Sequence, residues 1–148
     1  MDRAEKVTLT LPSSLAYLDA VQGLAEMLAA SAGFDEEAKL DLGLAVREGT
    51  INAMKHGNGL NPEKLVCVDF LTSEEGLRIA IRDEGAGFHP EATPDPTAPE
   101  NLWRSSGRGL LLIKSLVNQV SFVRHDRGME LILLKHRPSR SIAGEEAS

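Results

Sequence analysis

The chain has 148 residues, of which 42% are hydrophobic, and this length and composition suit one domain with its own core. Its formal net charge of -6 argues against a nucleic acid or an anionic membrane as the main partner, because both reward a basic surface. No apolar stretch approaches the roughly 18 residues of a membrane span, and the N-terminus lacks the apolar segment of a signal peptide. The single cysteine, Cys67, excludes internal disulfides and cysteine metal sites, and because it lies in an apolar run we predict that it belongs to the core. We therefore expect a soluble, cytoplasmic protein.

The first part of the chain predicts a strand followed by a helix. Apolar residues alternate with threonines before Pro12, a pattern typical of a strand that ends at this proline. From residue 15 to residue 32 apolar side chains recur at three- and four-residue steps, so we predict an amphipathic helix that ends at Gly33. Ser13 or Ser14 is suited to cap its first turn.

A second helix is expected to begin after Asp35, which is suited to cap it, and to end at Gly57. Glu36 and Glu37 favour its first turn through the helix dipole. Apolar residues again recur with a helical period along this segment. Its last part, "REGTINAMKHGNG" at residues 47–59, carries polar side chains at positions that could have been apolar.

The second half of the chain predicts two hairpins and one further helix. The short alternating runs that form the hairpins are residues 65–71 with 77–82, and residues 120–123 with 129–134. Residues 89–106 carry four prolines and few apolar residues, so we expect a long irregular loop of the kind that often serves as a lid. The third helix is expected directly behind Gly107 and Gly109.

The predicted order is strand, helix, helix, strand, strand, helix, strand, strand. This order is typical of an α+β fold, here a two-layer α/β sandwich with helices on one face of a mixed, mostly antiparallel sheet. We expect residues 1–137 to form this single domain and residues 138–148 to be a disordered tail.

Three groups of polar and glycine residues interrupt the apolar elements, each at the end of an element. In the first group, Glu48 and Asn52 are four residues apart on the second helix, so both can reach one ligand from the same helix face. A carboxylate beside an amide oxygen suits Mg²⁺ together with phosphate, since this ion is held by few protein ligands. The carboxylate could instead serve as a general base.

The second group, "DEGAGF", follows the strand at residues 77–82. Asp83 is therefore placed at a sheet edge, where its oxygens can accept a hydrogen bond from an amino group. Gly85 and Gly87 let the backbone approach a planar ligand closely, although such a glycine pair is on its own more often an ordinary turn.

The third group precedes the third helix. Gly107 and Gly109 leave the first amides of that helix accessible to an anion such as a di- or triphosphate. The guanidinium group of Arg108 adds a positive charge that can donate two hydrogen bonds to the same anion. Neither glycine pair fits the dinucleotide-binding fingerprint, and the Gly-Lys-Ser/Thr phosphate loop is absent. His56 has no second histidine at ligand spacing, so a metal-binding role is disfavoured, and we expect it either to cap the helix end or to lie near a bound nucleotide.

Taken together in this order, "EGTINAMKHG", "DEGAGF" and "GRGLLLI" resemble the N box and the two glycine boxes of the GHKL ATPase superfamily, which has the Bergerat fold. With "VTLTLPSS" at the start and "GRGLLLIKSL" near the end, the chain is most similar to the bacterial anti-sigma-factor serine/threonine kinases. The resemblance covers residues 5 to 135.

The resemblance implies a role for individual residues. Glu48 matches the family's catalytic acidic residue, which activates the substrate hydroxyl, and Asn52 matches its Mg²⁺ ligand. Asp83 matches the residue that accepts a hydrogen bond from the adenine amino group, and Gly85 and Gly87 shape that pocket.

By the same resemblance, Gly107, Arg108 and Gly109 fall in the lid segment that closes on the phosphates. Relatives often carry an arginine just before the second glycine box, and here Arg104 stands near that position. Which of the two residues contacts the γ-phosphate, Arg104 or Arg108, therefore stays open.

The resemblance also implies an ATP- and Mg²⁺-dependent protein serine/threonine kinase that silences a σ factor. It would phosphorylate a STAS-type anti-anti-sigma partner, adding about two negative charges that expel the partner. The first-helix region would contribute to a homodimer. Two alternatives are a non-catalytic module in which ATP regulates partner binding, and a kinase for an unrelated signalling protein.

Overall fold

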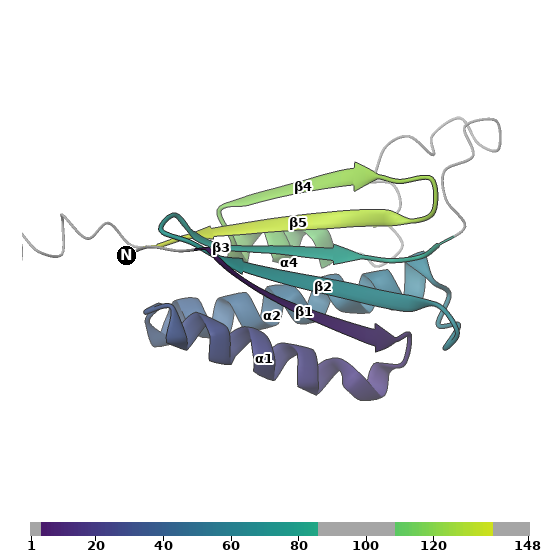
Figure 1. Ribbon diagram of the computed structural model, residues 1–148, viewed down its shortest axis with the longest axis horizontal. Helices are drawn as coiled ribbons and strands as arrows, with labels where there is room; N and C mark the ends of the chain where they lie inside the picture. The colour runs from purple at the N-terminus through teal and green to yellow at the C-terminus, as the bar shows by residue number, and fades with distance from the viewer. Residues whose placement is uncertain (1–3, 86–108, 138–148) are drawn as a thin grey trace, which may run out of the picture.

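The observed elements follow the predicted order (Figure 1). The structure is a computed structural model and describes residues 4–85 and 109–137. The strands are β1 (Glu5–Pro12), β2 (Leu65–Thr72), β3 (Gly76–Arg82), β4 (Gln119–Arg124) and β5 (Met129–His136). The helices are the 3₁₀ turn η1 (Leu15–Tyr17), α1 (Leu18–Ser31), α2 (Glu36–Asn52), the π-helical turn η2 (Ala53–Gly57) and α4 (Gly109–Leu116).

The five described strands form one sheet in the order β1-β2-β3-β5-β4. All pairings between them are antiparallel, and β3 lies in the centre. Figure 1 shows the helices together on one face of this sheet, which confirms the predicted two-layer α+β fold. None of the described helices is both long enough and apolar enough to span a bilayer.

Alternation along β2 decides which side chains meet the helices. Val66, Val68 and Phe70 are fully buried and belong to the core that β2 shares with α1 and α2. Cys67 stands between two of them in the sequence, so it lies on the opposite face, where it is half-buried. The prediction that Cys67 belongs to the core was wrong, because an apolar run in a strand serves both faces of the sheet.

The caps of the first two helical segments come from Ser14 and Asp35. The Ser14 hydroxyl accepts a hydrogen bond from the Ala16 amide at 3.3 Å, at the start of η1. The Asp35 carboxylate accepts from the Ala38 amide at 2.8 Å, as predicted. Ser13 is buried and takes another role, described below.

Helix α2 packs directly on the middle of the sheet. A Cβ atom at Gly49 would lie 2.7 Å from Cδ1 of Ile81 and 3.0 Å from Cδ2 of Leu131, so any larger residue would force the ends of these two side chains to move. Ile81 and Leu131 face each other across β3 and β5. The last turns of α2 are thereby held over the end of the central strand.

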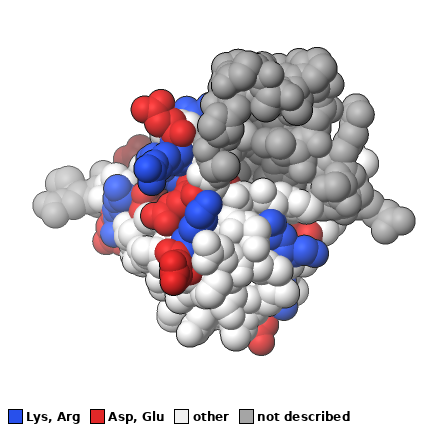
Figure 2. Space-filling view, turned by 90° about the vertical axis from the view of Figure 1, so that its right-hand side faces the viewer, with Lys and Arg blue, Asp and Glu red and all other residues white. Residues whose placement is uncertain are grey.

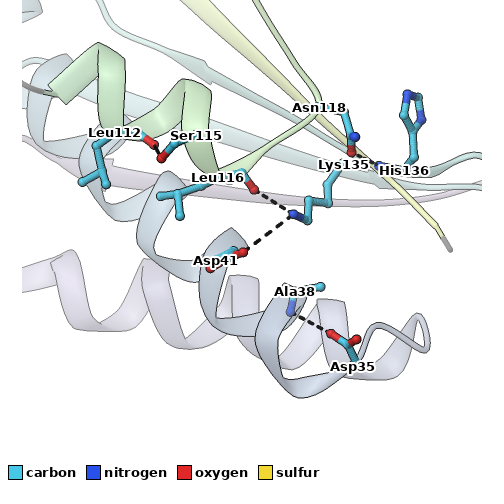
Figure 3. A network of polar contacts seen from close by, with 9 residues as sticks. All are labelled: Asp35, Ala38, Asp41, Leu112, Ser115, Leu116, Asn118, Lys135 and His136. Atoms are coloured by element: carbon cyan, nitrogen blue, oxygen red, sulfur yellow. Dashed lines mark hydrogen bonds and ion pairs between the residues drawn. The ribbon is translucent and has the colours of Figure 1, made fainter.

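The C-terminal end of α4 is tied to the rest of the domain by Lys135 of β5 (Figure 3). Its Nζ donates to the Leu116 carbonyl oxygen at 2.8 Å and lies 3.9 Å from a carboxylate oxygen of Asp41 in α2. Beside it, the amide of His136 donates to Oδ1 of Asn118 at 2.7 Å. A lysine that binds the last carbonyls of a helix satisfies groups that the helix itself leaves without partners.

We expect Lys135→Met to lower the free energy of unfolding by about 1–2 kcal/mol, because it removes a hydrogen bond and an ion pair at a mostly buried position. Urea unfolding of the purified protein measures this change. Lys6→Met is the control, since the Lys6 side chain is 61% exposed in its ion pair with Asp69, and its effect should stay below about 0.5 kcal/mol. Equal losses in both variants would contradict the role of Lys135.

Candidate functional site

Asn52 lies at the end of α2 and is 3% exposed. Its Nδ2 donates to the backbone oxygen of Glu48 at 2.9 Å, which fixes the orientation of the amide. Its Oδ1 has no hydrogen-bond partner among the residues that the structure describes. A buried carbonyl oxygen without a partner is costly, and an amide oxygen is a hard ligand of the kind that Mg²⁺ accepts. The position therefore fits the predicted metal ligand.

Glu48 stands one helical turn before Asn52. Its side chain is half-buried and lies on the same face of α2 as Asn52. The neighbouring residue is Gly49, whose contact with Ile81 sets the distance between this turn and β3. Glu48 is thus carried by a turn of α2 whose position is fixed by packing.

Asp83 follows β3 directly and is 7% exposed. Its Oδ1 accepts from the amides of Gly85 at 2.9 Å and Met129 at 3.1 Å, and its own amide donates to the Met129 oxygen at 3.0 Å. Protein amides thus take up Oδ1, whereas no hydrogen bond from another described residue reaches Oδ2. Oδ2 is the oxygen left for a donor on a ligand.

Burial raises the pKa of Asp83 above the ordinary value of an aspartate. The amides of Gly85 and Met129 act in the opposite direction, as do the positive charges of Lys64 and Arg82, but burial is the largest cause. The ionised carboxylate is therefore held at a cost in free energy. A ligand that donates a hydrogen bond to Oδ2 would offset part of that cost.

Three glycines from separate segments surround Asp83. A Cβ atom at Gly57 would collide with the Asp83 carboxylate, and one at Gly128 would collide with the Asp83 carbonyl oxygen. A Cβ at Gly85 would lie 2.5 Å from the Gly57 oxygen. The contact between Gly57 and Asp83 shows that the exit of α2 and the end of β3 meet, so Glu48, Asn52 and Asp83 occupy the same end of the domain.

Five of the predicted site residues lie within the described ranges, in three segments of the chain. Glu48, Asn52, Asp83 and Gly85 lie at this end, and Gly109 is buried at the start of α4, which packs on α2. The remaining predicted site residues lie outside the described residues: Gly87, Arg104, Gly107 and Arg108.

His56 lies in the π-helical turn η2 and is exposed. Within the described ranges, no group of three or more histidine, cysteine or acidic residues could hold a metal ion. The π-helical turn itself was not predicted, although such turns are frequent at functional sites.

Figure 2 looks onto this end of the molecule. Acidic and basic side chains lie next to one another on one side of the undescribed residues, and the lower part of the view has few charged residues. The described segments that reach the site contribute both signs, with Lys55, Arg82 and Glu84 exposed. A ligand that approaches this end therefore meets both positive and negative side chains rather than a surface of one charge sign.

We expect Gly128→Ala to lower the free energy of unfolding by about 2 kcal/mol or more, because φ at Gly128 is +97° and the new methyl group would strike the Asp83 backbone. Thermal unfolding measures the loss. Gly23→Ala is the control: Gly23 lies in α1 with no atom within 4 Å of its Cβ position, so this change should stabilise by about 0.5–1 kcal/mol. A Gly128→Ala variant as stable as the original chain would contradict the close approach.

Known proteins resemble this chain over most of its length. Serine-protein kinase RsbW of Listeria monocytogenes is 29% identical over 138 residues, which are 89% of this chain and 87% of that protein. Serine-protein kinase RsbW of Staphylococcus epidermidis is 28% identical over 137 residues, 88% of this chain and 86% of that one.

A crystal structure of the RsbU and RsbW domains of Rv1364c from Mycobacterium tuberculosis has the same fold, with a TM-score of 0.65 and 19% identity. The match covers 91% of this chain and 34% of that longer one. Residues 11–135 match the family described as histidine kinase-like ATPase domain. These findings confirm the superfamily predicted from the three boxes, and the chain belongs to the histidine kinase-like ATPase domain family.

Proposed function

We propose that this protein is an ATP-dependent serine/threonine protein kinase that also acts as an anti-sigma factor. The observation that carries the proposal is one end of the domain where a buried amide oxygen of Asn52 and a carboxylate oxygen of Asp83 both lack partners among the described residues. Glu48 lies one turn from Asn52. The serine-protein kinases among the relatives support the same activity.

The adenine base would bind at Asp83. Its amino group would donate to Oδ2, the oxygen that the backbone amides leave available. Gly57 and Gly85 carry no side chain there, so a planar base can lie close to the backbone. The phosphates would extend toward the start of α4 at Gly109, where helix amides favour anions. Gly87 would complete the base pocket, and Gly107 with Arg104 or Arg108 would contact the phosphates.

Glu48 would orient the acceptor hydroxyl and take its proton. The hydroxyl oxygen then bonds to the γ-phosphorus while the bond from that phosphorus to the ADP oxygen breaks. Asn52 Oδ1 would hold Mg²⁺, which when bound supplies positive charge beside the phosphates.

The acceptor would be a serine or threonine of a STAS-type anti-anti-sigma protein, and the second partner a σ factor. Both partners are proteins, which suits a chain with a net charge of -6 better than a nucleic acid would. We place the protein in the cytoplasm, where σ factors act. A homodimer through the region of α1 is part of the proposal, and Met27 of this helix is 60% exposed.

Incubation with γ-labelled ATP, Mg²⁺ and a candidate STAS partner tests the proposal. We expect label on the partner with the original chain and none with Asn52→Ala, which removes the oxygen proposed to hold the metal. Ala53→Gly is the control, because Ala53 is the next residue and is also buried. This variant should retain transfer of the label. Tight ATP binding without transfer to any partner would instead support a non-catalytic module in which ATP regulates binding.

A further inference from the structure

Asn58 is a polar residue that is buried in the fold. It is 4% exposed and follows the π-helical turn directly. Its Nδ2 donates to the Ser13 hydroxyl at 2.8 Å and to the Leu65 oxygen at 3.1 Å. Its Oδ1 accepts from the amide of Glu84 at 2.8 Å. One side chain therefore joins the ends of three strands and the exit of α2.

The groups around Asn58 also bind one another. The Ser13 hydroxyl donates to the Lys64 oxygen at 2.7 Å, and a Glu84 carboxylate oxygen accepts from the Leu65 amide at 2.9 Å. Both donors of the Asn58 amide and its oxygen thus have partners. A buried polar network in which each member is satisfied fixes one geometry of the segments that it joins.

The Glu84 amide is the first backbone donor after Asp83. Asp83 still pairs with β5 through its own amide, but β3 has ended at Arg82, and Glu84 is held by Asn58 instead of by a strand. On its other side, the Asp83 carboxylate rests on Gly57, the residue just before Asn58. Residues 57 and 58 therefore constrain both the backbone that follows Asp83 and the side chain itself.

We propose that Asn58 is a positioning residue that makes the site selective for adenine, because its contact with the Glu84 amide sets the direction of the Asp83 carboxylate. The inference rests on the proposed binding of adenine at Asp83. Its consequence is that loss of the Asn58 oxygen weakens recognition of the adenine amino group more than it weakens recognition of the ribose and phosphates.

A comparison of two nucleotides separates positioning from general stability. Purine riboside triphosphate lacks the 6-amino group of ATP but keeps the ring, the ribose and the phosphates. The original chain should bind ATP about tenfold or more tightly than this analogue, because only ATP donates to Asp83. In Asn58→Ala the preference for ATP should fall to about twofold or less, because the Asp83 carboxylate is no longer held in the direction of the adenine amino group. Calorimetric titration with each nucleotide in the presence of Mg²⁺ gives both dissociation constants.

Ser13→Ala is the matched control. It removes one partner of Asn58 Nδ2 and the bond to Lys64, so it lowers the unfolding temperature, but it leaves the contact between Asn58 and Glu84 in place. A merely structural role of Asn58 would change both affinities equally in each variant. We therefore expect the preference for ATP to survive in Ser13→Ala and to be lost only in Asn58→Ala.

Each outcome decides between the claims. If the original chain itself does not distinguish the two nucleotides, the binding of adenine at Asp83 is wrong. If it does and Asn58→Ala retains the full preference, only the role of Asn58 is wrong. Should Asn58→Ala fail to fold, Asn58→Leu replaces it, because leucine fills nearly the same volume without the oxygen that accepts from the Glu84 amide. We expect that variant to lose the preference as well, and a full preference there would overturn the inference.

Discussion

Glu48→Gln is expected to lower phosphate transfer by about 10²- to 10⁴-fold while ATP remains bound. Glutamine has nearly the shape of glutamate but cannot take a proton from the acceptor hydroxyl. The half-buried side chain has no hydrogen bond or ion pair with another described residue, and α2 is held at this turn by Gly49 on Ile81. Single-turnover transfer of labelled phosphate and a separate measurement of ATP affinity check the two parts of this result.

Glu37→Gln is the control for the Glu48 experiment. Glu37 lies in the first turn of the same helix and is exposed, so its loss should leave transfer unchanged. If Glu48→Gln transferred phosphate at the original rate, Glu48 would not be the base. If it lost ATP binding as well, its role would lie in holding the nucleotide.

Asp83→Asn is expected to weaken ATP binding by about 100-fold without loss of stability. The amides of Gly85 and Met129 require an acceptor, so the new side chain would keep its oxygen there and place its NH₂ group where Oδ2 stands. Two donors would then face each other in the complex with adenine. The variant should gain in relative affinity for inosine triphosphate, which has an oxygen at that ring position.

The stability of Asp83→Asn follows from the sign of the pKa shift. Burial raises the pKa of Asp83, so its contribution to folding is most favourable below its unfolded pKa and declines as the pH rises through its folded pKa. At neutral pH a neutral amide avoids that penalty, and we expect the unfolding temperature not to fall.

Asp69→Asn is the control for the Asp83 experiment. Asp69 lies on β2 and accepts from the Thr8 hydroxyl at 2.6 Å on the sheet face opposite the helices. It should leave the affinity for ATP unchanged. Undiminished ATP binding by Asp83→Asn would remove Asp83 from the base pocket.

The sequence predicted those parts of the site that a local pattern encodes. The four-residue spacing of Glu48 and Asn52 on a helix, and the place of Asp83 after an alternating strand, needed no tertiary information. The fold class followed from the order of the elements for the same reason. The cap at Asp35 was also predictable, because its bond to Ala38 spans only three residues.

The remaining parts depend on contacts between distant segments. Gly57 and Gly128 each lie against Asp83, but in the sequence they mark only a helix end and a hairpin turn. Asn58 and Ser13 are 45 residues apart and meet only once β1 and the exit of α2 are in place. Cys67 was misplaced because composition alone does not tell which face of a strand a residue occupies.

A crystal structure with a non-hydrolysable ATP analogue and Mg²⁺ tests the central claim most directly. We expect the adenine amino group about 3 Å from Asp83 Oδ2, the metal ion bound to Asn52 Oδ1, and the γ-phosphate on the side of Glu48. A base whose amino group points away from Asp83, or a metal ion that does not contact Asn52, would contradict it.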